Sequence, residues 1–251
     1  MRGRAVTGGA PVTGGATVTD VAARFPGRWA EDRMLLGDSV RWPDLEIRVD
    51  DDAVDRAILV AVEREGRSTL LGRGDPAAAV RLAGDWLAAH SRAGRAPTVG
   101  WMSLPRGVTV PESVLDRVAL APVSTWDWMV TGRAPVVAGA AETVVRLDPR
   151  ADGDAIRDCL AVANPGTTAD PSGPGEAGWF GVRDGDALVG VMGATWRGGP
   201  VSGAFSWHLH GLGVVPHARG RGLGGALTAA VTMAGFEAGA SWVSLGLYAD
   251  N

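Results

Sequence analysis

A glycine-rich stretch with two arginines is the part of the sequence best suited to chemistry. It reads VVPHARGRGLGG from Val214 to Gly225. Glycine leaves its amide group uncovered, and a helix that begins in such a run points free N–H groups and the positive end of its dipole at one spot. We therefore expect this stretch to bind an anion, most naturally a phosphate or pyrophosphate. A tight strand-to-helix turn is the alternative interpretation.

Two other phosphate-binding motifs fit this stretch less well. Gly220, Gly222 and Gly225 satisfy the GxGxxG pattern of dinucleotide-binding folds, but the strand that should run directly into the first glycine ends at Val215. Too little chain follows to complete the sheet of such a fold. A P-loop needs a lysine for the phosphates, and the sequence contains none.

Two histidines precede the glycine-rich stretch, His208 and His210. Side chains alternate between the faces of a strand, so both histidines should lie on one face. Imidazole titrates near neutrality and can accept a proton from a reacting group. Hydrogen bonding within the sheet, or lining a cleft, is the competing role for both. A metal site would need a further ligand from His90, His217 or scattered carboxylates, and we expect none.

Hydrophobic periodicity and turn residues predict the elements that position these side chains. Strands are predicted at LEIRV (45–49), in part of AILVAVERE (57–65), and at STWDWMV (124–130), TVVRLDP (143–149), WFGVR (179–183), ALVGVMGATW (187–196), FSWHLHGLGVV (205–215) and WVSLGLY (242–248). Helices are predicted after Asp75–Pro76 up to Gly94, over 111–118, over 151–163, and from within the glycine run to Gly239. The stretch 166–178 lacks periodicity and is expected to be a loop.

The chain length and a small-residue stretch at 131–142 favour two domains with a boundary near Pro135. Residues 1–20 repeat VTGGA and are expected to form a mobile tail. Residues 21–135 should form a smaller mixed α/β domain, and residues 136–251 a second α/β domain with a mixed sheet.

Composition limits the function. An apolar fraction of 46% with 21% charged residues, and no long apolar run, is typical of a soluble protein without membrane contact. The 24 basic residues are all arginine and form no basic block, so we expect no nucleic-acid partner. Cys159 is the only cysteine, which excludes an internal disulfide and fits a cytoplasmic protein. We expect this cysteine to be buried as a small hydrophobic residue.

The residues from Arg219 to Gly224 match the Arg/Gln-x-x-Gly-x-Gly/Ala signature of the GNAT superfamily of acyl-CoA N-acyltransferases. The flanks are typical of the same family: a strand that ends in Val-x-Pro at 214–216, an Ala-Leu pair at 226–227, and the upstream hairpin FGVRDGDALVGVMG. From about Thr143 to Asn251 the chain therefore resembles a GNAT domain. The first domain could be a degenerate copy of that fold, without the phosphate site.

The resemblance implies a function. It implies transfer of an acetyl or other short acyl group from acyl-CoA, with acetyl-CoA as the expected donor, to an amine on a small molecule or peptide. His208 stands where the family commonly has the carboxylate that deprotonates the amine, so His208 and His210 are the catalytic candidates. The cofactor-binding residues implied are Leu212, Val214, Arg219, Gly220, Arg221, Gly222, Leu223, Gly224, Gly225 and Asn251.

The sequence departs from the family pattern at two places. The position of the common carboxylate holds His208, and no tyrosine follows Asn251 to protonate the departing thiolate, since Tyr248 lies before it. We therefore expect the last family elements to be missing from this sequence. The alternative function is a GNAT-like module that binds CoA or another metabolite without turnover.

Overall fold

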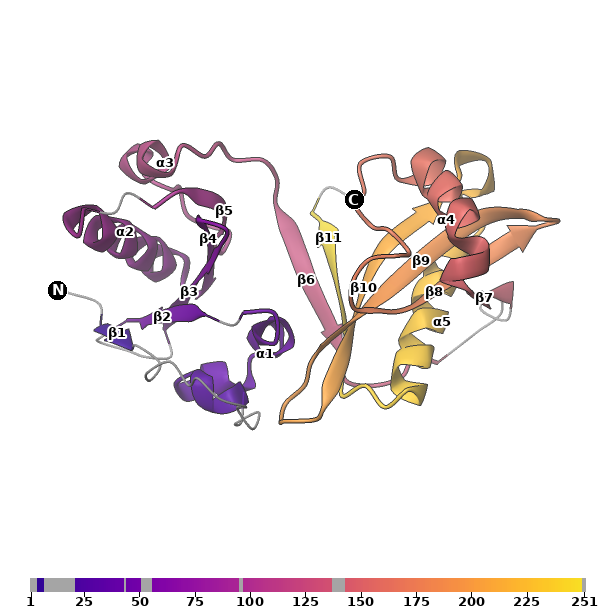
Figure 1. Ribbon diagram of the computed structural model, residues 1–251, viewed down its shortest axis with the longest axis horizontal. Helices are drawn as coiled ribbons and strands as arrows, with labels where there is room; N and C mark the ends of the chain where they lie inside the picture. The colour runs from indigo at the N-terminus through magenta and orange to yellow at the C-terminus, as the bar shows by residue number, and fades with distance from the viewer. Residues whose placement is uncertain are drawn as a thin grey trace. The chain divides into compact units, whose positions relative to one another are not determined.

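The computed structural model describes residues 4–6, 21–42, 44–50, 56–94, 97–136 and 143–249. The chain divides into two compact units, Met1–Thr125 and Trp126–Asn251 (Figure 1). The division falls before the expected boundary near Pro135. The reason is strand β6 (Trp126–Thr131), which pairs along its whole length with β11 (Val243–Tyr248) and so belongs to the second unit.

The first unit has a five-stranded sheet in the order β1-β2-β3-β4-β5. Its strands are β1 (Arg4–Val6), β2 (Leu45–Val49), β3 (Ala57–Arg64), β4 (Arg67–Gly74) and β5 (Val99–Ser103), and its helices are η1 (Val21–Arg24), η2 (Gly27–Glu31), α1 (Arg33–Ser39), α2 (Pro76–Arg92) and α3 (Glu112–Val118). Neighbouring strands are antiparallel except β4 and β5, which α2 connects in parallel.

Helix α2 forms as its sequence predicts. The Asp75 carboxylate accepts a hydrogen bond from the Ala78 amide at 2.8 Å, and Pro76 occupies the first turn, where no intrahelical donor is needed. Val80, Ala83 and Leu87, which recur at helical spacing, are all buried, and Ala83 and Leu87 belong to the core that α2 shares with the sheet.

The second unit has a six-stranded sheet in the order β6-β11-β10-β9-β8-β7 (Figure 1). Its remaining elements are β7 (Val145–Leu147), α4 (Pro149–Ala163), β8 (Glu176–Asp184), β9 (Ala187–Gly198), β10 (Phe205–Val214), η4 (Pro216–Ala218) and α5 (Leu223–Glu237). The fold class is therefore mixed α/β with two mixed sheets, as predicted.

Helices α4 and α5 cover opposite faces of this sheet. A Cβ at Gly213 of β10 would lie 2.9 Å from the side chain of Ala163 of α4. A Cβ at Gly190 of β9 would lie 3.1 Å from Leu227 of α5 and 3.5 Å from Val214, so Val214, the next residue of β10, points toward α5. Since successive strand residues point to opposite faces, the two helices define an α4 face and an α5 face. Cys159 of α4 is buried, as expected, and burial raises the pKa of its thiol.

Strands β10 and β11 run parallel and then part. They pair at only three positions, ending at Leu209 opposite Leu245, and β10 then bulges between His210 and Gly213 on its other edge. From His210 onward, no strand of the described chain pairs with the β11 side of β10. An open backbone edge therefore leads from the sheet centre toward the start of α5.

No helix among the described residues has the length and apolar character needed to cross a membrane.

Candidate acyl-CoA site

The glycine-rich stretch makes the turn between β10 and α5. Gly220 and Gly222 have φ angles of +75° and +76°, a left-handed conformation that side-chain-bearing residues rarely adopt. A Cβ at Gly225, in the first turn of α5, would meet open space. The helix therefore begins with its amides uncovered.

The amide groups from Gly220 to Gly225 donate to no acceptor in the described chain. A hollow of about 280 Å³ lies against them and is lined by Val214, Ala218, Arg219, Gly220, Gly222, Leu223, Gly224 and Gly225. Free amides and the positive end of the α5 dipole can hold a diphosphate there. Most of the cofactor-binding residues expected from the sequence thus lie around one opening.

The other expected cofactor residues lie at different distances from this hollow. Leu212 reaches within 3.9 Å of a Cβ position at Gly224. The Arg221 side chain is 56% exposed and lies 3.8 Å from the Asp184 carboxylate, where it is free to swing toward an anion. Asn251 lies outside the described residues.

Arg219 is exposed, and its side chain lies against the ends of β10 and α4. Its Nε donates to the Val214 carbonyl at 2.9 Å, and Nη2 donates to the Ala163 carbonyl at 3.1 Å. The guanidinium therefore fastens the end of β10 to the end of α4. The arginine of the signature also lines the hollow, and its contact with a cofactor stays a prediction.

His208 lies where β10 and β11 are still paired. Its Nδ1 is 3.0 Å from Oγ of Ser244, which stands opposite it on β11. The side chain is thus held across the paired part of the sheet.

His210 lies one step past the parting of the strands, on the same α4 face as His208. Its Nε2 is 3.2 Å from Oε2 of Glu176, and the exposed fractions of the two side chains are 20% and 13%. The Trp179 ring meets the imidazole edge-on at a centroid distance of 5.4 Å. Glu176 falls within the loop expected from the sequence at 166–178, whereas it is the first residue of β8. Its approach to His210 depends on strand register, which is not visible in the sequence.

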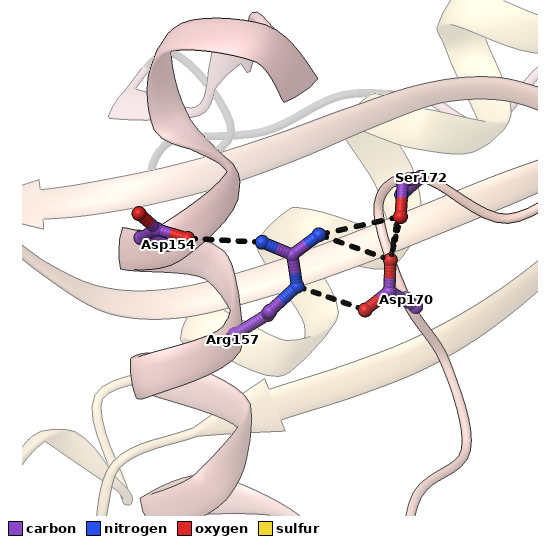
Figure 2. Close-up of polar contacts among 4 residues, drawn as sticks. All are labelled: Asp154, Arg157, Asp170 and Ser172. Carbon is purple, nitrogen blue, oxygen red and sulfur yellow. Dashed lines mark hydrogen bonds and ion pairs between the residues drawn. The ribbon is translucent and has the colours of Figure 1, made fainter.

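The loop that precedes Glu176 is fastened to α4 by a polar cluster (Figure 2). The Arg157 guanidinium donates to both Asp170 carboxylate oxygens, at 2.8 and 3.2 Å, and to Asp154 at 3.0 Å. The Ser172 hydroxyl and amide also donate to Asp170. These hydrogen bonds hold the pKa of Asp170 well below its usual range, and the bond from Arg157 contributes most, followed by those from Ser172.

We expect Asp170→Asn to loosen this loop. A neutral amide loses the charge-assisted bonds from Arg157, so hydrogen exchange across residues 165–175 should rise about two- to fivefold at pH 7. Asp154→Asn, which removes the charge from one exposed bond of the cluster, should change exchange less. Equal exchange in Asp170→Asn and the unmodified protein would contradict this role.

The lowered pKa of Asp170 also fixes the pH dependence of the cluster. Its stabilisation is complete above the pKa of an unfolded aspartate, about 3.9, and is lost only as the pH falls through the lower folded pKa. Exchange across the loop, corrected for intrinsic rates, should therefore stay constant between pH 7 and pH 5.

No group of three or more His, Cys, Asp or Glu side chains within the described ranges could hold a metal ion.

Comparison with known proteins gives a family match for the second unit. Residues 151–251 match the family model described as "Acetyltransferase (GNAT) family". No curated protein matches the chain.

Several solved structures are similar to the chain at low identity. A GCN5-related N-acetyltransferase from Sphaerobacter thermophilus has 17% identity and a TM-score of 0.45, covering 82% of this chain and 72% of that one. One from Kribbella flavida has 18% identity and a TM-score of 0.45, with coverages of 83% and 80%. A tandem GNAT protein from the clavulanic acid biosynthesis pathway has 16% identity and a TM-score of 0.40, with coverages of 93% and 85%.

The signature, the uncovered amides and the family match agree, and the part of the chain from residue 151 to residue 251 is a GNAT acetyltransferase domain.

Proposed function

We propose that the protein transfers an acetyl or other short acyl group from acyl-CoA to an amine. The observation that carries this proposal is the run of amides from Gly220 to Gly225, which have no acceptor in the described chain and open onto a hollow. A diphosphate there would satisfy these amides and complement the dipole of α5. Acetyl-CoA is the donor we propose.

The open edge of β10 suits the rest of the donor. The backbone from Leu212 to Val214 leads from the hollow toward the point where β10 and β11 part, so an extended pantetheine arm can follow it. The thioester would then lie near His210 and His208, one of which takes the proton of the amine. A backbone amide on the open edge of β10, beside the thioester, would stabilise the oxyanion.

A second candidate function is a module that binds CoA or another metabolite without turnover. His208 stands where the family commonly has a carboxylate, and this departure favours the second candidate.

Titration calorimetry and a thiol-release assay separate these functions. We expect acetyl-CoA to bind the purified protein, and free thiol to appear with at least one of n-butylamine, 2-phenylethylamine, glucosamine, spermidine or a peptide with a free N terminus. Binding without thiol release would support the module. Absence of binding at millimolar acetyl-CoA would overturn both.

A further inference from the structure

We propose that His210 is the group that takes the proton from the amine, and that Glu176 is its positioning residue. This inference rests on the proposed function and names the machinery of the same site. It starts from the ion pair between His210 Nε2 and Glu176 Oε2, 3.2 Å apart. Both atoms are buried, and neither makes an aligned hydrogen bond to any described group, so each is the other's nearest polar partner.

The position of His210 along β10 favours it over His208. His208 belongs to the last paired stretch of β10 and β11, and its Nδ1 faces Ser244. His210 is the first residue of β10 on its face beyond the pairing, at the head of the open edge. A thioester carried along that edge comes within reach of His210 before it reaches His208.

The imidazole of His210 is held from two sides. Trp179, which is fully buried, presents its ring edge-on, and Glu176 approaches Nε2. Glycine at position 193, directly across on β9, makes this packing possible. A Cβ there would lie 2.8 Å from Cε1 of His210 and 2.9 Å from the Trp179 ring.

Glu176 is itself fixed by the loop that precedes it. A Cβ at Gly173 would lie 3.4 Å from Oε1 of Glu176, so the loop backbone packs against the carboxylate. The Arg157–Asp170–Ser172 cluster ties this part of the loop to α4 (Figure 2). The carboxylate therefore meets the imidazole from a supported position.

This geometry assigns the two ring nitrogens of His210. The Glu176 carboxylate lies 3.2 Å from Nε2 and favours a proton on that nitrogen, which leaves the lone pair on Nδ1. No hydrogen bond to Nδ1 is found among the described residues. As the neutral amine nitrogen attacks the thioester carbonyl carbon, the N–C bond forms and the C–S bond then breaks. The amine proton passes to Nδ1, and the departing thiolate gains a proton from the imidazolium or from water. The negative charge of Glu176 stabilises the transient imidazolium.

The test compares Glu176→Gln, His210→Gln and the double variant in the thiol-release assay, with acetyl-CoA and the amine that the unmodified protein uses. Glu176→Gln should lower kcat about 100-fold and change KM and Kd for acetyl-CoA less than about twofold. Glu176→Asp should recover part of kcat. In the double variant, kcat should fall no further than in His210→Gln, because Glu176 acts through the imidazole.

The controls separate positioning from folding. Glu63→Gln makes the same change at an exposed position in the first unit and should leave kcat unchanged. If Glu176→Gln lowers kcat by the same factor with or without His210, or leaves kcat intact, this inference is wrong while the acyltransfer proposal stands. If the unmodified protein binds acetyl-CoA but acylates none of the amines, the acyltransfer proposal and this inference are both overturned.

Discussion

Gly225→Asp is expected to weaken acetyl-CoA binding by about 100-fold or more. The new carboxylate would stand in the open space beside the free amides, within the hollow that the diphosphate would fill. Two unit charges about 4 Å apart near a protein surface repel by about 4 kcal/mol, and even part of this is enough for such a loss. Titration calorimetry with acetyl-CoA measures the effect.

The same substitution should stabilise the fold. An acidic side chain in the first turn of α5 complements the helix dipole by about 0.3–1 kcal/mol, and replacing a helical glycine adds to this. Gly225→Asn is the matched control, with the same shape and no charge, and should bind acetyl-CoA much more tightly than Gly225→Asp. Equal affinities of the two variants for acetyl-CoA would show that the diphosphate does not bind beside Gly225. Gly222 suits this test less well, because its φ of +76° would add backbone strain to the charge effect.

Gly193→Ala is expected to lower kcat about 10- to 100-fold while leaving acetyl-CoA affinity nearly intact. The added methyl group would overlap the Trp179 ring and Cε1 of His210. Trp179 is fully buried and cannot yield, so the imidazole must move away from Glu176. Displacement of a reacting group by about 1 Å can cost about 100-fold in rate. Overpacking should also cost about 1–3 kcal/mol of unfolding free energy.

Gly166→Ala is the control for this substitution. A Cβ at Gly166 meets no atom within 4 Å, and its φ is not positive, so kcat and thermal stability should hardly change. A Gly193→Ala protein that unfolds at nearly the normal temperature and retains full kcat would show that the position of His210 does not limit the reaction.

The sequence predicted the second unit well because its elements carry local signals. Two apolar runs predicted β8 and β9, and the short DGD turn between them predicted a hairpin. Apolar residues at helical spacing, Ile156, Leu160 and Ala163, predicted α4 and are buried. In the first unit, the Asp75–Pro76 start of α2 was equally clear. Helix α1 and strand β4 gave no comparable signal and were missed.

The remaining features depend on contacts between distant segments. Strand β6 was predicted as a strand but assigned to the first unit, since its hydrogen bonds go to β11, more than 100 residues later. The turn of Arg219 toward Ala163, and the approach of Glu176 to His210, depend on strand register and helix placement. The hypothesis that the first unit is a degenerate copy of the second stays a prediction.

The strand order of the second unit has a consequence for work with isolated pieces of the protein. Both outer strands of its sheet, β6 and β7, precede residue 151, where the family match begins. A recombinant fragment trimmed to the matched residues would expose the bare backbone of β11 on one side and of β8 on the other, and such uncapped strands invite self-association. Precipitation of that fragment would result from the loss of β6 and β7 and would not show that the complete second unit is unstable.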